Sequence, residues 1–278
     1  MNTTQETLNF NEDGLQVKYN FLSEKEISEL KKECTELFSN TQLMGPGYSV
    51  RLSKYVHEIP QPTVKLTSVN LLEVAIDIAE EIKKMGHENY KFAHVALYKE
   101  EGNPKELVWH SDMRNGGLIR AQICIQGGDL SSGAFKYCTS THKIADGKFS
   151  PPEGYLEQNK DKIITCNKPN GSLFLINTLG YHSKCICVER RISLMFDFLP
   201  ANYIVDTPND CASDILLSSS RLSEKVIKNI DLFKSGVTPF TKSNNTPDYY
   251  KFYKPFGGSN LKDWMSFIKK MIKRKLKR

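Results

Sequence analysis

The chain has 278 residues, of which 39% are hydrophobic and 25% are charged, and its formal net charge is +6 at pH 7. A chain of this size and composition can bury a full hydrophobic core, which excludes a disordered protein and a small disulfide-dependent scaffold. No apolar run approaches the roughly 18 residues of a membrane span, and the start, MNTTQETLNFNEDG, lacks the features of a signal peptide. We expect a cytoplasmic globular protein.

Cysteine usage supports a reducing compartment. The seven cysteines are scattered along the chain and their number is odd, which favours free thiols. Cys185 and Cys187 form a CxC pair, but the sequence contains no second cysteine pair to complete a zinc site. We therefore interpret both as structural residues.

Two helices are expected in the first third of the chain. Residues 22–38 begin with Ser23 and Glu26 at the spacing of a capping box and continue with an apolar stripe. Residues 68–86 repeat apolar side chains at helical spacing and end at Gly86, which is typical of a helix stop.

From residue 90 onward the pattern is that of strands. Short segments rich in β-branched and aromatic residues are separated by Gly, Pro, Asn and Asp. The expected strands are 90–98, 118–126, 134–138, 162–166, 172–177 and 191–199. This spacing favours an antiparallel sandwich or barrel preceded by helices, and a further helix is expected around 223–233.

The positive charge is concentrated at the C-terminus, where the last ten residues, KKMIKRKLKR, include no acidic residue. Residues 261–278 also place Trp264 and aliphatic residues at helical spacing, so we divide the chain into a domain, 1–258, and a basic amphipathic helix, 259–278. Two interpretations of this helix remain open: peripheral contact with the inner membrane face, or packing against the domain. Nucleic acid is not expected as a partner, because no reading motif accompanies the basic residues. The sequence does not predict the oligomeric state.

The stretch LVWHSDMRN, residues 107–115, contains a candidate metal-binding pair, His110 and Asp112. In an extended strand, residues two apart point to the same side, so both side chains can contact one ion. His182 is the best candidate for a third ligand, because it follows a buried-looking strand and a turn. Two histidines and a carboxylate leave one face of an octahedral ion open, which is the arrangement of non-haem Fe(II) oxygenases.

The segment RRISLMFDF, residues 190–198, has two alternating faces. The apolar face would pack under covering helices, and the face with Arg191, Ser193 and Asp197 would line a barrel interior. A buried arginine is costly unless it meets an anion. The partner could be Asp197 or a diffusible dicarboxylate bound by Arg191 and Ser193, and Arg191 could instead be an exposed strand charge. A dicarboxylate that also reaches iron through a keto-acid end would be 2-oxoglutarate.

Taken together, the HxD pair, a histidine about 70 residues later and an Arg-x-Ser beyond it resemble the Fe(II)/2-oxoglutarate-dependent oxygenase superfamily. Residues 127–143, GGDLSSGAFKYCTSTHK, and 171–185, GSLFLINTLGYHSKC, are similar to segments of its phytanoyl-CoA dioxygenase-like family. The resemblance covers about 90–199. It implies a mostly β chain with flanking helices (α+β), whose core is a double-stranded β-helix, jelly-roll or cupin-like, with helices packed on the major sheet.

The resemblance also implies roles for individual residues. Fe(II) would be bound by His110, Asp112 and His182, and 2-oxoglutarate by Arg191 with Ser193. Gln122 aligns by spacing with a family position that contacts 2-oxoglutarate.

Two departures from the family pattern matter. Residues 139–141, Thr-Ser-Thr, replace the usual Pro-Gly before a Ser-His-like sequence, so that turn differs. The arginine lies nine residues after His182, where several relatives place it two residues later, which leaves Arg190 as a rival to Arg191. Asp112 is present where halogenating relatives lack a carboxylate, which argues against halogenation.

The implied activity is that of a dioxygenase that consumes O2 and 2-oxoglutarate, releases succinate and CO2, and hydroxylates a C–H bond of a small-molecule metabolite in biosynthesis. Desaturation or demethylation would use the same residues. Two alternatives remain open: the same chemistry on a lipid-linked or surface-glycan precursor at the membrane, and a non-catalytic cupin-like binding protein. Candidates for shaping a substrate cavity, or for ordinary core positions, are Tyr98, Trp109, Arg114 and Tyr181.

Overall fold

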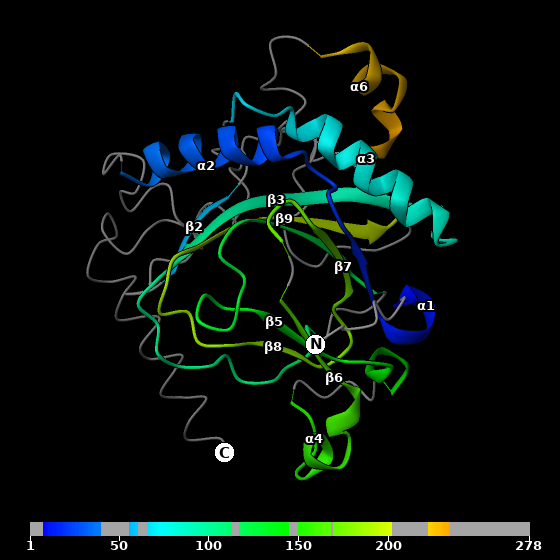
Figure 1. The fold of residues 1–278 in the computed structure, drawn as a ribbon. Helices are drawn as coiled ribbons and strands as arrows, with labels where there is room; N and C mark the ends of the chain where they lie inside the picture. The colour runs from blue at the N-terminus through cyan, green and yellow to red at the C-terminus, as the bar shows by residue number, and fades with distance from the viewer. Residues whose placement is uncertain are drawn as a thin grey trace, which may run out of the picture.

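The computed structural model describes residues 8–39, 56–60, 66–112, 117–144, 150–167, 169–201 and 222–233, with the backbone alone at 56–60 and 94. Arg114 and the expected C-terminal helix, 259–278, lie outside these residues. Two antiparallel sheets face each other, and two long helices lie across the outer side of the larger one (Figure 1). None of the helices in this part of the chain is long and apolar enough to cross a membrane.

The larger, major sheet has six strands in the order β1-β7-β4-β9-β3-β2. Their bounds are Leu15–Lys18 (β1), Val56–Pro60 (β2), Tyr90–Glu100 (β3), Ile119–Gln126 (β4), Leu173–Asn177 (β7) and Arg191–Pro200 (β9). The strands expected at 90–98, 118–126, 172–177 and 191–199 are confirmed. The two edge strands, β1 and β2, were not predicted, and each extends the sheet from a segment ahead of the β core.

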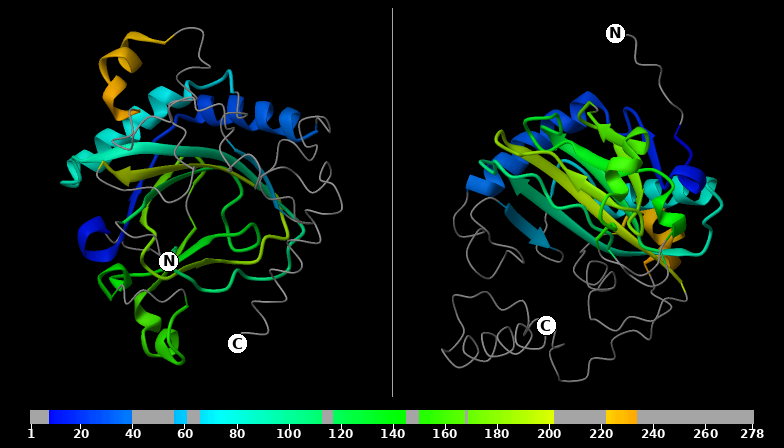
Figure 2. Two further views of the ribbon diagram at one scale, coloured as in Figure 1. Left: turned by 180° about the vertical axis from the view of Figure 1, so that it is seen from behind. Right: turned by 90° about the horizontal axis from the view of Figure 1, so that it is seen from below.

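The smaller, minor sheet has three strands in the order β6-β5-β8. Their bounds are Phe135–Cys138 (β5), Ile163–Cys166 (β6) and His182–Lys184 (β8). Between them lie short helical turns at Thr141–Ile144 (η1), Tyr155–Gln158 (α4) and Lys160–Lys162 (η2). An isolated antiparallel bridge between His110 and His182 brings the HxD segment alongside β8. Figure 2 shows from two further directions how this sheet lies opposite the major one.

The helices that cover the major sheet are α2 (Glu24–Ser39) and α3 (Leu71–Lys84), which confirms both predicted helices. The backbone N–H of Ser23 donates to the Glu26 carboxylate at 2.8 Å, so the capping box is formed. The helix expected around 223–233 is a short α6 (Glu224–Lys228) followed by the turn η3 (Ile230–Leu232). It is shorter than predicted because Asn229, in a non-helical conformation, ends α6. The short α1 (Phe10–Asp13) was not predicted.

A large hydrophobic core fills the space between these helices and the major sheet. It contains the predicted apolar face of β9, all of it fully buried: Ile192, Leu194, Phe196 and Phe198. Each fully buried side chain of this size contributes about 1.5–3 kcal/mol relative to an exposed one. Because side chains alternate along a strand, the remaining face of β9, from Arg191 to Asp197, points into the barrel.

Candidate metal centre

Three side chains form the one cluster of potential metal ligands found in the described part of the chain: His110, Asp112 and His182. One ligand atom from each lies within 4.8 Å of the other two. Asp112 Oδ1 is 3.8 Å from Nε2 of His110 and 4.0 Å from Nε2 of His182. The structure therefore brings together the pair and the distant histidine that the sequence suggested.

Backbone pairing places these residues. The N–H of His110 donates to the carbonyl of His182 at 3.0 Å, and the N–H of His182 donates to the carbonyl of His110 at 2.8 Å. The N–H of Asp112 donates to the carbonyl of Thr178 at 2.9 Å, on the far side of the turn that leads into β8. Two segments about 70 residues apart in sequence are thus held against each other by main-chain bonds, and the Ser183 hydroxyl adds a bond to the Leu107 carbonyl.

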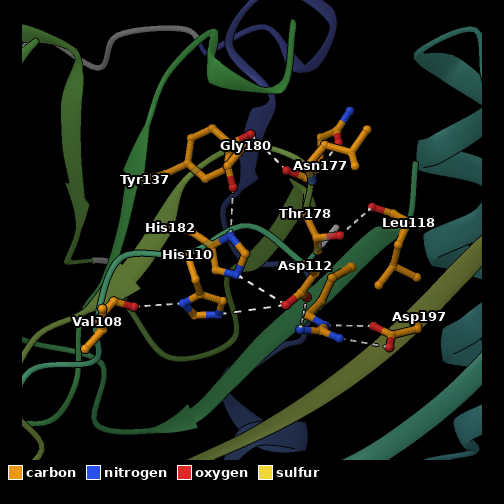
Figure 3. Close-up of polar contacts among 12 residues, drawn as sticks. Val108, His110, Asp112, Leu118, Tyr137, Asn177, Thr178, Gly180, His182 and Asp197 are labelled. Atoms are coloured by element: carbon orange, nitrogen blue, oxygen red, sulfur yellow. Dashed lines mark hydrogen bonds and ion pairs between the residues drawn. The ribbon is translucent and has the colours of Figure 1, made fainter. Parts of the chain in front are cut away.

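Both histidines have a defined tautomer (Figure 3). Nδ1 of His110 lies 2.8 Å from the carbonyl of Val108, and Nδ1 of His182 lies 2.8 Å from the carbonyl of Gly180. A carbonyl can only accept, so each Nδ1 carries the proton and each Nε2 presents a lone pair toward Asp112. Burial also lowers the pKa of His182 to about 4, which keeps this ring neutral and able to bind a metal near pH 7.

Arg120, on β4, holds the carboxylate of Asp112. Its Nη1 donates to Asp112 Oδ2 at 2.9 Å, while Nε and Nη2 donate to the two carboxylate oxygens of Asp197 at 2.8 and 3.0 Å. Burial lowers the pKa of Arg120, but the two carboxylates outweigh this and raise it above its ordinary value. Asp112 Oδ2 is therefore occupied by a permanent cation, and Oδ1 faces the histidines.

Sequence reasoning missed Arg120, although a signal was present. In β4, the apolar side chains of Ile119, Ala121 and Ile123 belong to the helix-covered core, so Arg120 and Gln122 share the interior face. Arg120 is two residues from Gln122, which was already a candidate site residue on this strand. That spacing could have indicated that Arg120 also points into the barrel.

The turn before His182 is braced by Tyr137 of β5. The Tyr137 hydroxyl donates to the carbonyl of Asn177 at 2.9 Å, and the backbone N–H of Tyr181 donates to the Thr141 hydroxyl at 2.8 Å. A Cβ at Gly180 would overlap the Tyr137 hydroxyl and lie 2.5 Å from its ring carbon Cζ. The close packing of this turn fixes the carbonyl that orients the His182 ring.

Arg191 lies inside the barrel with only 9% of its surface exposed, so it is not an exposed strand charge. Its Nε is buried without a hydrogen-bond partner among the residues that the structure describes. Asp197, the protein carboxylate considered as its mate, is bound by Arg120 instead. The rival, Arg190, is exposed on the outside and pairs with Glu101 at 2.6 Å.

The other candidates have different positions. Gln122 and Ser193 are both buried, on the interior faces of β4 and β9. Tyr181 is buried and its ring contacts that of Tyr155 at a centroid distance of 5.9 Å. Tyr98 and Trp109 are half-buried.

The donor set suits a catalytic metal ion. Two neutral imidazoles and one carboxylate oxygen converge from one side, which leaves positions on the ion for other ligands and matches the facial set of non-haem Fe(II) sites. A structural zinc site would use four ligands and commonly thiolates, and the cluster contains no cysteine.

No family model and no curated protein matches the chain. Solved structures do match it. The epimerase SnoN of nogalamycin biosynthesis, in complex with Fe3+, alpha ketoglutarate and nogalamycin RO, is 15% identical, with a TM-score of 0.57 over 69% of this chain and 81% of SnoN. The alpha-ketoglutarate-dependent carbocyclase SnoK, from the same biosynthesis, is 14% identical, with a TM-score of 0.55 over 72% of this chain and 85% of SnoK.

EctD from S. alaskensis, solved with 2-oxoglutarate and 5-hydroxyectoine, is 14% identical, with a TM-score of 0.58 over 74% of this chain and 79% of EctD. These likenesses concern the backbone arrangement of sheets and covering helices. They confirm the predicted mixed α+β architecture with a double-stranded β-helix core. The chain has the fold of the Fe(II)/2-oxoglutarate-dependent oxygenases.

Proposed function

We propose that this protein is an Fe(II)- and 2-oxoglutarate-dependent oxygenase that acts on a small-molecule metabolite. The observation that carries the proposal is the pairing of two features in one barrel: a cluster with the facial donor set, and a buried guanidinium with an unpartnered Nε on the interior of β9. The first suits an iron ion, and the second suits the distal carboxylate of a dicarboxylate cosubstrate.

In this proposal, His110, Asp112 and His182 hold the iron. Their Nε2 and Oδ1 atoms are already directed at one another, so little reorganisation precedes metal binding. Arg120 keeps Asp112 Oδ2 occupied, which leaves Oδ1 as the ligand atom. When bound, iron and 2-oxoglutarate would supply O2 activation coupled to decarboxylation, with release of succinate and CO2.

Arg191 is proposed to bind the distal carboxylate of 2-oxoglutarate through a charge-assisted bond, with Ser193 and Gln122 as neighbouring polar groups on the barrel interior. Gln122, Arg191 and Ser193 are all buried, so we expect water to be largely excluded from this position. Such exclusion strengthens the ionic contact and prevents unproductive side reactions.

The test is anaerobic addition of Fe(II) and 2-oxoglutarate. A weak visible charge-transfer band should appear with the wild-type protein and be absent in Asp112→Ala. Asp161→Ala, which removes an exposed aspartate, serves as the matched control and should keep the band. A wild-type protein without the band would refute the proposal and favour a non-catalytic cupin-like binding protein.

A second comparison separates the two arginines. Arg191→Met should weaken 2-oxoglutarate binding, measured by titration of the same band, because it removes the buried cation. Arg190→Met removes an exposed arginine from the adjacent position and should leave the affinity unchanged. The opposite order of effects would transfer the cosubstrate role to Arg190.

Hydroxylation is the reaction that we propose, although the matched structures include an epimerase and a carbocyclase. Screening metabolites, including lipid-linked and glycan precursors, for stimulated succinate release would find substrates. Product mass then distinguishes the reactions: hydroxylation adds one oxygen, epimerisation leaves the mass unchanged and ring closure removes two hydrogens. A product that lacks added oxygen would overturn hydroxylation but not the oxygenase assignment.

A further inference from the structure

A second cation lies at the Arg191 end of the barrel. Lys184 is two residues after His182 on β8, so both side chains point to the same face of the minor sheet. In the register with β5, Lys184 is opposite Phe135 and His182 is opposite Tyr137. Both aromatic rings belong to an interior cluster, which places Lys184 inside the barrel with its side chain only 15% exposed.

Lys184 forms an ion pair with Glu100 that joins the two sheets. Glu100 is buried at the end of β3 and is the register partner of Arg191 on β9. Its carboxylate receives the Lys184 ammonium on one oxygen, and the side-chain amide of Asn103 donates to the other oxygen at 2.8 Å. Glu100 therefore has a cation and an amide donor as partners, and Arg191 is not ion-paired with it in the described residues.

The two cations are near each other. Burial lowers the pKa of Lys184, Glu100 raises it, and repulsion from Arg191 lowers it. Burial raises the pKa of the Cys187 thiol, and both cations act to lower it, so both lie near this thiol. A Cβ at Gly133 would lie 3.3 Å from Cys187 Sγ and 3.3 Å from Arg191 Cδ, which places these two side chains close together. Among the described residues, this end of the barrel thus holds two cations, Lys184 and Arg191, and one buried carboxylate, Glu100, an imbalance of one positive charge. Buried charge is costly without a partner, so the site is built for one further carboxylate.

We propose that Lys184 and Arg191 together bind the distal carboxylate of the 2-oxo acid, so that Lys184 sets the cosubstrate specificity of the site. The inference rests on the proposed function and adds a residue that it does not require. Two residues along a strand span about 6.6 Å, so Lys184 lies roughly that far along β8 from the ligand His182. A ligand that reaches the metal with one end would bring its other end toward Lys184.

Glu100 has a specific part in this arrangement. It neutralises one of the two cations, which leaves one positive charge for a single incoming carboxylate, and it competes with that carboxylate for Lys184. Removal of Lys184 and removal of the Glu100 charge should therefore change cosubstrate affinity in opposite directions. An ion pair that only holds the sheets together predicts the same direction for both.

The experiment measures the 2-oxoglutarate Kd of the Fe(II)-loaded protein under anaerobic conditions. Loss of one charge-assisted bond should raise the Kd of Lys184→Met by about tenfold or more. Glu100→Gln should lower the Kd several-fold relative to wild type. Titration with 2-oxopentanoate, which has the same chain length but no distal carboxylate, should give equal Kd values for wild type and Lys184→Met.

Lys136→Met is the matched control. Lys136 lies on the neighbouring strand β5 between Phe135 and Tyr137, whose rings point to the interior, so its own side chain points to the outer face. There it pairs with Glu106 at 2.7 Å. This variant should leave the Kd unchanged. An unchanged Kd in Lys184→Met, or a raised Kd in Glu100→Gln, would overturn the inference while the wild-type band still supports the oxygenase. Absence of 2-oxoglutarate binding in wild type would overturn both.

Discussion

The two sheets of the barrel are stabilised in different ways. The major sheet has long strands, with 11 residues in β3 and 10 in β9, and packs on α2 and α3 through the large core. The minor sheet has strands of four residues in β5 and β6 and three in β8, and its interior cluster is small. Both histidines of the metal cluster are nevertheless on the minor-sheet side.

On the minor-sheet side, hydrogen bonds between side chains and backbone hold the chain in place. The bonds from Tyr137 to Asn177 and from Tyr181 to Thr141 fix the turn ahead of His182. Apolar burial therefore stabilises one side of the barrel, while on the other side a few close contacts set the position of the ligand atoms. Substitutions on the two sides should therefore have different consequences.

The largest effect is expected in the core of the major sheet. Phe196 is fully buried and its ring centroid is 6.3 Å from that of Phe92. Phe196→Ala should lower the free energy of unfolding by about 3–5 kcal/mol, because it removes buried apolar contacts and leaves a cavity. Denaturant titration measures this. Ile227→Ala, which truncates a side chain that is 57% exposed on α6, should change stability little, and an equal loss in both variants would contradict the assignment of the core.

The second effect comes from metal binding, which should stabilise the minor-sheet side. At a concentration one hundred times its Kd, an ion that binds only the folded protein adds about 2.7 kcal/mol. Addition of Fe(II), or of redox-inert Ni(II), should raise the thermal midpoint of the wild type and not of Asp112→Ala. Hydrogen exchange should show the added protection at β8 and the HxD segment between β3 and β4. Uniform protection of both sheets would show that the sheets do not differ in local stability.

The sequence predicted the major sheet better than the minor one for a physical reason. The alternation of Ile192, Leu194 and Phe196 with polar residues is a repeating signal along ten residues, and it correctly identified the buried face of β9. The three residues of β8 are too few for a periodic signal. There, only the residue types of the HxD pair and His182 indicated a site.

Edge strands and ion-pair partners were harder to predict. β1 and β2 each pair with a strand far away in sequence, and their short segments have no strong strand pattern of their own. That Asp197 pairs with Arg120 instead of Arg191 depends on which side chains of two neighbouring strands, β4 and β9, meet in space. Local spacing does not contain that information, so Asp197 stayed open as an alternative to a dicarboxylate partner of Arg191.

A third, smaller effect is expected where the minor-sheet side is most closely packed. Gly180→Ala places a methyl group against the Tyr137 ring and hydroxyl. Overpacking of this kind costs about 1–3 kcal/mol, and it should also weaken metal binding because the Gly180 carbonyl orients His182.

Gly86→Ala is the control for this substitution. A Cβ at Gly86 would meet no atom within 4 Å, although its φ of 88° adds backbone strain. This variant should lose stability without any change in metal affinity. Isothermal titration with Ni(II) measures the affinity of both variants, and equal affinities would show that the contact with Tyr137 does not position the ligand.

The smallest effect is a pH dependence at His142. Its ring lies near Tyr137, since a Cβ at Gly14 would be 2.5 Å from His142 Nδ1 and would overlap the Tyr137 hydroxyl. Burial lowers its pKa, with smaller opposing contributions from the Asn11 carbonyl and from Asp13 and Glu12, while Lys143 lowers it further. Its Nδ1 has no hydrogen-bond partner in the described part of the chain, so the folded protein favours the neutral ring. The unfolded chain binds a proton at the ordinary pKa of about 6.5.

Because the unfolded state binds more protons, His142 stabilises the fold above that pKa, and this contribution is lost as the pH falls toward the lower folded pKa. The slope for one group is at most about 1.4 kcal/mol per pH unit. Denaturant titrations of metal-free wild type and His142→Gln between pH 7.5 and about 5.5 should show a shallower loss of stability in the variant. Other titrating groups affect both proteins alike, so the difference in slope isolates His142. Identical slopes would mean that the His142 ring gains a proton as readily in the folded barrel as in the unfolded chain.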